Sequence, residues 1–298
     1  MVSPALPHAG SSNAAKAILM MVAAAGILTV NDAIAKWLTE RYPVGQVLAM
    51  RGGIVVVLVY SWAVVSGRGS VLRVKSWPLH LARGGLMAVS TFLFVTSLWL
   101  LPIADAIAIS FAGPIFATAL AALILGEPVG WRRWSAVAVG FAGVVVMVRP
   151  TPEMFRVVAL IPIVAAFVGA LRDIVTRRLG TGGESTLMVL IVSTSIVAFA
   201  GLLTLPFGWV VPTLSELGLI AATSVLVAVA QGLMIESLRL GEVGLVGPFK
   251  YTSLLWALLL GLFVWGDVPG SWTLAGAALV VASGLYIWHR ETAMRRST

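Results

Sequence analysis

Residues 31–36 read NDAIAK, and residues 172–177 read RDIVTR. Each hexapeptide has an acid four residues before a base, and each lies near the end of a long apolar run. The similarity continues at an offset of 140 residues, because SLWL at 97–100 aligns with SLRL at 237–240 and GE at 126–127 aligns with GD at 266–267. Self-similarity at a fixed offset indicates an internal repeat. The sequence therefore predicts two related halves, residues 14–149 and residues 156–289.

The apolar runs around these motifs are long enough to cross a lipid bilayer. Hydrophobic residues make up 59% of the 298-residue chain and charged residues only 11%, against about 25% charged residues in soluble domains. A membrane-spanning helix needs about 20 mostly apolar residues. We predict an all-α integral membrane fold of ten transmembrane helices. They cover residues 17–38, 44–66, 81–101, 104–125, 135–148, 157–176, 186–205, 216–237, 245–264 and 272–288.

The number of helices in each half fixes how the halves relate. Each half holds five predicted helices, which is an odd number, so the second half enters the membrane upside down relative to the first. Such an inverted repeat has a pseudo-two-fold axis in the membrane plane. It offers two nearly equivalent packings, one open to each side, and so predicts transport by alternating access.

Basic residues predict how the chain is oriented. If the N-terminus is cytoplasmic, the external loops hold only Arg41, Arg149 and Arg156, and the internal segments hold most of the other basic residues. Basic residues favour the cytoplasmic side. We therefore expect both termini in the cytoplasm of a bacterial cell whose inner membrane holds the protein. The net charge of +8 is explained by this bias and does not predict a nucleic-acid partner.

Ionisable residues inside the predicted helices are candidates for a binding site or a gate, because such residues are costly in hydrocarbon and need a partner or a cavity. Near the outer surface, Asp32 can pair with Arg51, and Asp105 can join them. On the inner side, a second predicted cluster consists of Arg172, Asp173, Glu236 and Lys250.

Simpler roles stay open for several of these charges. Lys36 and Arg83 lie close enough to helix ends to snorkel to the lipid headgroups. Asp32 with Lys36, and Asp173 with Arg177, have the i,i+4 spacing of structural ion pairs.

Uncharged side chains can complete a cavity between the halves. The candidates are Thr96, Trp99, Gln231, Tyr251, Ser253 and Trp256, whose aromatic members suit a planar substrate; the alternative for each is packing between helices. Pro114 and Pro248 lie inside predicted helices, where the carbonyls they free need protein or a cavity to satisfy them. The small residues Gly140, Gly143, Gly276 and Gly284 predict close helix packing.

Several classes of protein find no support in the sequence. The chain has no cysteine, which excludes disulfides and thiolate metal sites, and it has no Walker A, HExxH or GxSxG motif. Its histidines, at positions 8, 80 and 289, lie in tails or at interfaces. We expect no cofactor and no metal. The expected partners are a small-molecule substrate, the lipid bilayer and a coupling proton or counter-substrate, the proton being carried by Asp32 or Asp173.

The turn at 126–128 (GEP), followed by WRRW at 131–134 and GFAG at 140–143, resembles the drug/metabolite transporter superfamily with two EamA-type domains. The resemblance covers nearly the whole chain, with Asp267 in place of the usual glutamate in the second half. The motifs around Asp32, Arg51 and Asp173 are most similar to the ten-helix branch that includes S-adenosylmethionine and riboflavin carriers. It implies a site between the halves and no nucleotide hydrolysis, but a shared fold does not fix the substrate.

The leading hypothesis is a secondary transporter or facilitator for a small polar metabolite such as riboflavin, S-adenosylmethionine or an amino acid. An exporter of amino acids or drug-like compounds is the alternative within the same superfamily. A membrane-embedded lipid-modifying enzyme and a membrane assembly protein are the remaining alternatives. The enzyme would need catalytic groups that converge on one leaflet, whereas the charges here are scattered over both halves.

Overall fold

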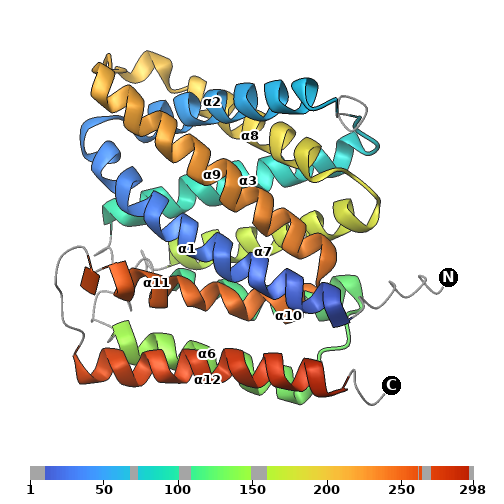
Figure 1. Cartoon of the computed structure of the whole chain (residues 1–298). Coiled ribbons are helices and arrows are strands. Elements are labelled where there is room, and N and C mark those ends of the chain that lie inside the picture. Colours follow the sequence, from blue (N-terminus) through green and yellow to red (C-terminus); the bar gives the residue numbers. More distant parts are fainter. Residues whose placement is uncertain are drawn as a thin grey trace.

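The computed structural model describes residues 11–67, 73–100, 109–148, 160–260, 262–263 and 270–294. Within these ranges every regular element is a helix, and the helices form ten segments (Figure 1). They are α1 (Ser11–Arg41), α2 (Val44–Val65), α3 (Trp77–Leu100), α5 (Gly113–Leu120) with the π-helical η2 (Ala121–Leu125), α6 (Trp131–Val148), α7 (Leu160–Thr181), α8 (Thr186–Leu202), α9 (Leu214–Leu240), α10 (Val243–Val246) with the 3-10 segment η6 (Gly247–Tyr251) and α11 (Thr252–Leu260), and α12 (Ser271–Met294). A short 3-10 turn, η5 (Leu205–Phe207), follows α8.

The helices have the length and surface that a bilayer requires. Most of α1, all of α2 and α9, and the run Val243–Leu260 are each long and apolar enough to span a membrane. Large apolar side chains cover the outside of the molecule, and Val65 and Leu214 are each 87% exposed. Apolar surface on this scale favours lipid over water as its surroundings. The predicted all-α integral membrane fold of ten helices is confirmed.

Several predicted spans differ from the observed helices at their ends, since α1 begins at Ser11, α3 at Trp77 and α7 ends at Thr181. Two further differences have a local cause. The helix predicted at 135–148 begins at Trp131, because Arg132 and Arg133 lower the hydropathy of its first turn without stopping the helix. The helix predicted at 245–264 is interrupted, since the 3-10 segment η6 separates α10 from α11. Pro248 has no backbone N–H to donate, so the α-helical hydrogen-bond pattern cannot continue through this position.

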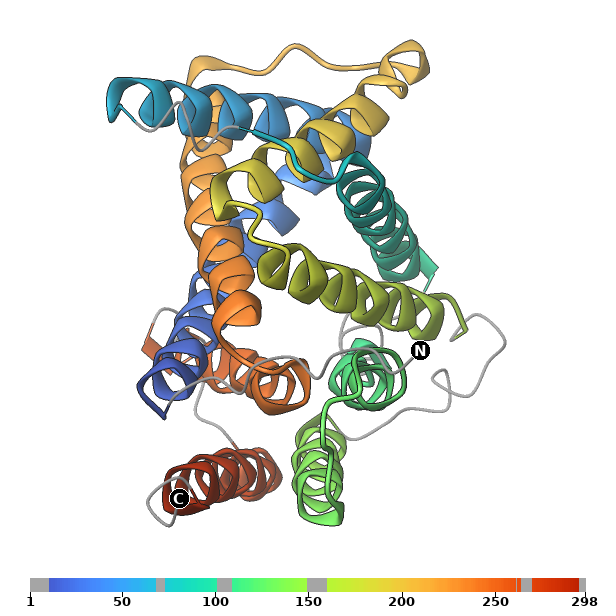
Figure 2. The ribbon, with the colours of Figure 1, turned by 90° about the vertical axis from the view of Figure 1, so that its right-hand side faces the viewer.

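The helix packing repeats between the two halves of the chain. The helix α1 packs on α9 and α11, and its predicted counterpart α7 packs on α3 and α5. The counterparts α2 and α8 pack on each other, as do α6 and α12. Figures 1 and 2 place the α2–α8 pair at one side of the molecule and the α6–α12 pair at the opposite side. Exchanging each helix for its counterpart thus reproduces the same pairs.

Glycines allow two of these pairs to approach closely. A Cβ atom built on Gly143 would lie 2.8 Å from the backbone oxygen of Gly276, and one on Gly201 would lie 2.5 Å from the backbone oxygen of Gly45. Real Cβ atoms do not come so near, so α6–α12 and α2–α8 depend on glycine at these positions. The predicted packing role of Gly143 is confirmed.

The first described helix begins, and the last one ends, at the same end of the molecule. In Figure 1 the start of α1 and the end of α12 both lie on the right. An even number of membrane crossings requires this arrangement. The cytoplasmic location of this end stays a prediction.

Candidate functional site

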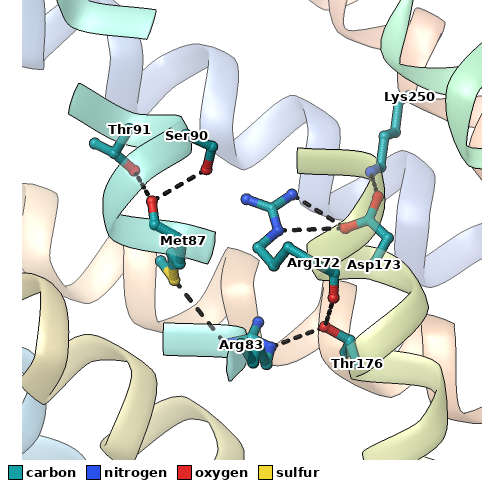
Figure 3. Close-up of polar contacts among 8 residues, drawn as sticks. All are labelled: Arg83, Met87, Ser90, Thr91, Arg172, Asp173, Thr176 and Lys250. Atoms are coloured by element: carbon teal, nitrogen blue, oxygen red, sulfur yellow. Dashed lines mark hydrogen bonds and ion pairs between the residues drawn. The ribbon is translucent and has the colours of Figure 1, made fainter. Parts of the chain in front are cut away.

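A buried acid on α7 holds two basic side chains together. The Asp173 residue is 2% exposed, and its Oδ1 accepts hydrogen bonds from Nε and Nη2 of Arg172, at 3.3 and 3.1 Å. Its Oδ2 accepts a hydrogen bond from Nζ of Lys250 (Figure 3). At a rise of 1.5 Å per residue, Asp173 lies about 12 Å from the end of α7 at Thr181. The ion pairs therefore lie well inside the helical region.

Arg83, on α3, extends this group of charges. Its Nε donates a 2.8 Å hydrogen bond to Oγ1 of Thr176, and that hydroxyl in turn donates to the backbone oxygen of Arg172, at 2.7 Å. Arg83 is 2% exposed, so the expectation that it snorkels to the headgroups is wrong. The helix rotation turns its side chain toward α7. We call Arg83, Arg172, Asp173 and Lys250 the α7 cluster.

The way the chain folds locally explains how three elements reach one point. Arg172, Asp173 and Thr176 share one turn of α7, so one side of that helix presents both charges and a hydroxyl. Lys250 comes from η6, where the break at Pro248 changes the direction of the side chains. Figure 3 shows Lys250 and Arg172 reaching Asp173 from different directions, and Arg83, on α3, reaching Thr176 one turn further along α7.

Two predicted members of this group lie elsewhere. Glu236 was expected beside Asp173 but pairs with Arg239, at 2.8 Å, and accepts a hydrogen bond from the hydroxyl of Thr186. Arg177 was expected to pair with Asp173 at i,i+4 but instead donates to the backbone oxygens of Leu238 and Arg239. Asp173 prefers Lys250, which comes from another helix, and so the local pairing does not form.

The predicted outer pair is looser than expected. Asp32 is exposed and accepts a 3.0 Å hydrogen bond from Nδ2 of Asn31. Arg51 is half-buried, and its charge and that of Asp32 act on each other. Among the described residues these two form no ion pair within 4.0 Å. Asp105 and the side chain of Lys36, the other predicted partners, lie outside the described part of the structure.

The uncharged candidates divide into satisfied and unsatisfied groups. The hydroxyl of Thr96 donates to its own helix at Phe92, at 2.8 Å, and that of Ser253 donates to the backbone of Lys250 at 2.9 Å. The indole of Trp256 donates to the backbone oxygen of Val22 at 3.1 Å. These contacts favour packing over substrate binding for all three residues.

Two of the uncharged candidates have a buried polar atom without a hydrogen-bond partner among the described residues. The atoms are Oε1 of Gln231 and the hydroxyl of Tyr251. Tyr251 is 1% exposed, and its ring lies 5.9 Å from that of Phe111 and against Gly140. Tyr251 thus belongs to the packed interior between α6 and η6. The side chain of Trp99 lies outside the described part.

Sequence reasoning assigned no role to Glu127, which joins the two halves. Its Oε1 and Oε2 accept hydrogen bonds from the backbone N–H groups of Val243 and Gly244, at 3.0 and 2.9 Å, and Nε of Arg177 lies 3.9 Å from Oε1. Burial raises the pKa of Glu127 above its ordinary value, and the two backbone hydrogen bonds partly offset this effect. We call these interactions the Glu127 contact. It ties the turn after η2 to the start of α10.

A second acid, Glu184, holds the start of α3 at the same end of the molecule. Its Oε1 accepts hydrogen bonds from the backbone N–H groups of Lys75 and Ser76, both at 2.7 Å, and its Oε2 lies 3.3 Å from Nε2 of the buried His80. Burial alone would raise the pKa of Glu184, but His80 and these N–H groups lower it below its ordinary value. A carboxylate at the start of a helix also suits the helix dipole.

Polar contacts also join the halves at the opposite end. Glu216, in the first turn of α9, pairs with Arg41 at 2.6 Å and accepts a 2.5 Å hydrogen bond from the hydroxyl of Tyr42. Nearby, the amide of Gln46 bonds the backbone of Val210 in both directions. The sequence placed Arg41 only in an external loop. The structure therefore has inter-half contacts at both ends and charges between them.

The charged side chains of the α7 cluster are suited to hydrogen bonding with a polar solute. Within the described ranges no three metal-ligating side chains come together. The α7 cluster offers strong hydrogen-bond donors inside the helical region, and its Arg172 and Lys250 side chains stay 17% and 22% exposed. These groups can bind a polar solute and release it.

Comparisons with known proteins agree with this architecture. The profile of the EamA-like transporter family matches residues 15–149. A riboflavin transporter of Rhizobium johnstonii is 30% identical over 291 residues, which cover 96% of this chain and 94% of the relative. An S-adenosylmethionine uptake transporter of Rickettsia prowazekii is 26% identical, and the match covers 88% of this chain and 89% of the relative. A pseudopaline exporter of Pseudomonas aeruginosa is 25% identical, and the match covers 89% of this chain and 93% of the relative. A solved structure matches 93% of this chain and 96% of its own with a TM-score of 0.78 at 20% identity, which supports the fold.

Proposed function

The chain belongs to the EamA-like transporter family, and on this premise we propose that it is a secondary transporter or facilitator that moves a small polar metabolite by alternating access. Family membership makes it a multi-pass membrane transporter and not an enzyme. The observation that carries the proposal is the α7 cluster, because ionisable groups kept inside a membrane domain are retained where they serve a solute or ion pathway.

The relatives narrow the class of substrate. They are named for riboflavin, S-adenosylmethionine and pseudopaline, which are all small metabolites with many polar groups. We propose a metabolite of this kind for the present chain. Export of amino acids or drug-like compounds is the second candidate, which the exporter among the relatives favours.

Alternating access follows from the proposed inverted repeat. The matched helix pairs, in which α1 packs on α9 as α7 packs on α3, support a two-fold relation between residues 14–149 and 156–289. Two halves related in this way can exchange conformations and so open toward either side. The bacterial origin of the relatives supports a bacterial inner membrane, and the distribution of basic residues supports both termini in the cytoplasm.

The contacts between the halves supply the gates in this proposal. The Glu127 contact lies at the end where α1 begins, and the contacts of Glu216 lie at the other end. Opening toward one side requires the contacts at that side to separate while those at the other side persist. Backbone N–H groups held by a carboxylate suit this task, since water can replace the carboxylate when the gate opens.

Flux into liposomes tests the proposal. Purified protein is reconstituted, and uptake of labelled riboflavin, S-adenosylmethionine and a set of amino acids is measured with and without a proton gradient. We expect flux of at least one compound, lost in Lys250→Gln and kept in Lys16→Gln, whose exposed lysine lies at the start of α1. Absence of flux for the whole panel, with the protein folded by circular dichroism, would contradict the proposal.

A further inference from the structure

The α7 cluster contains more positive than negative charge. It holds the cations Arg83, Arg172 and Lys250 and the single carboxylate of Asp173. Both ion pairs of the cluster converge on that one carboxylate. The charged groups that act on Arg83 are Arg172 and Asp173, one of each sign. The cluster therefore lacks an anion.

The imbalance is centred on Arg83. Its side-chain partners in Figure 3 are the neutral Thr176 hydroxyl and, at 3.9 Å, the sulfur of Met87. Within the part of the chain that the structure describes, no carboxylate lies within 4.0 Å of its guanidinium. Arg83 lies six residues into α3, about 9 Å along the helix. A buried guanidinium without a carboxylate is destabilising, so a partner from outside the protein would stabilise it.

We propose that the α7 cluster binds the carboxylate group of the transported solute. The inference rests on the proposed function and names its substrate class, an organic carboxylate. The chemistry is already present in the structure, because Arg172 and Lys250 now hold the two oxygens of one carboxylate, that of Asp173. Arginine and lysine bind carboxylates through short, charge-assisted hydrogen bonds. Their partly exposed side chains leave room for a second carboxylate to approach.

Binding at this point would also affect the interrupted helix. Lys250, on η6, forms an ion pair with Asp173 of α7, and a solute carboxylate would compete with Asp173 for its ammonium. When Lys250 turns to the solute, this ion pair between η6 and α7 is lost. The same event that recognises the anion therefore frees the segment between α10 and α11 to move.

Matched probes test the charge requirement directly. Binding to the purified protein is measured by thermal shift for S-adenosylmethionine against its decarboxylated form, and for L-tryptophan and L-methionine against their carboxamides. Riboflavin serves as the uncharged probe. We expect the carboxylate member of at least one pair to bind about tenfold more tightly or better, as the loss of a charge-assisted hydrogen bond implies.

Variants then assign the preference to the cluster. Arg83→Gln should abolish the preference for the carboxylate probe while keeping a hydrogen-bond donor for Thr176. Arg83→Lys should retain part of this preference. Asp173→Asn should tighten carboxylate binding, because it removes the competing anion. Arg132→Gln is the matched control, since this arginine is exposed and stacks on Trp131. If Arg83→Gln does not fold, the carboxylate preference is tested instead with Lys250→Gln and with the paired probes on the unsubstituted protein.

The outcomes separate this inference from the proposed function. Flux of a compound without any carboxylate preference, or riboflavin flux that Arg83→Gln leaves unchanged, overturns the carboxylate site and leaves the transporter intact. Carboxylate-dependent binding without flux supports the site and counts against transport. Equal binding of both members of every pair overturns the site.

Discussion

The Glu127 contact gives a prediction about the closed end of the molecule. Replacing Glu127 with alanine removes two charge-assisted hydrogen bonds, those from the backbone N–H groups of Val243 and Gly244 at 3.0 and 2.9 Å. Bonds of this kind contribute about 1.5–3 kcal/mol each. Because water can reach this turn once it opens, we expect the lower bound for the pair, about 3 kcal/mol. A factor of ten per 1.4 kcal/mol makes the open state about 100-fold more populated.

Cysteine labelling can measure this change. The chain has no cysteine of its own, so Thr118→Cys introduces a unique thiol at a wholly buried position beside Gly244. We expect its labelling by a membrane-impermeant maleimide, added at the predicted cytoplasmic side, to be about 100-fold faster in the Glu127→Ala background. The reagent is kept dilute so that opening and closing are faster than labelling, because the rate then follows the population of the open state.

A second carboxylate provides the control for that experiment. Glu236→Ala removes a side chain that is 30% exposed and paired with Arg239, and exposed pairs contribute at most about 1 kcal/mol, or about fivefold. If both alanine variants change the labelling rate equally, or if Glu127→Ala leaves it unchanged in folded protein, Glu127 does not hold this end closed.

Three further predictions concern pH, packing and transport. The pKa of Glu184 is lowered in the folded protein, so its ionised carboxylate stabilises the folded state at pH values above the ordinary glutamate pKa of 4.5. This stabilisation is lost as the pH falls through the folded-state pKa. Between pH 7 and pH 4 the melting temperature should therefore decline less in Glu184→Gln than in the unsubstituted protein. Gly143→Val should lower the melting temperature by the equivalent of about 1–3 kcal/mol, because its side chain meets the backbone of Gly276; Gly53→Val, where no atom lies within 4 Å of a built Cβ, is the matched control. Arg51→Ala should reduce flux more than stability, and normal flux in well-inserted protein would rule out a transport role for Arg51.

The fold was predictable because hydropathy and the internal repeat report on burial along the chain. Apolar length defines a span, and the breakers between spans, such as the turn after Leu125, are local in sequence. The interruption at Pro248 was visible as a proline, but its size was not. Whether a proline bends a helix or converts five residues to 3-10 geometry depends on the neighbouring helices.

The site was less predictable because it depends on helix rotation. Asp173 and Lys250 were both candidates, and the structure pairs them. Glu236 was placed with them by depth alone, yet its helix turns it toward Thr186. Snorkelling to the headgroups stayed open as a simpler role for Arg83 because it lies near a helix end, and the rotation of α3, which buries its side chain, excludes that role.

The 3-10 geometry of η6 has a mechanical consequence. A 3-10 helix rises about 2.0 Å and turns about 120° per residue, against about 1.5 Å and 100° in an α-helix. Rewinding Phe249–Tyr251, the part of η6 that follows Pro248, into α-helix would draw α10 and α11 together by about 1.5 Å and rotate one against the other by about 60°. Such a screw motion would swing the ammonium of Lys250 around the axis and pull the two ends of this segment inward, without bending any other helix.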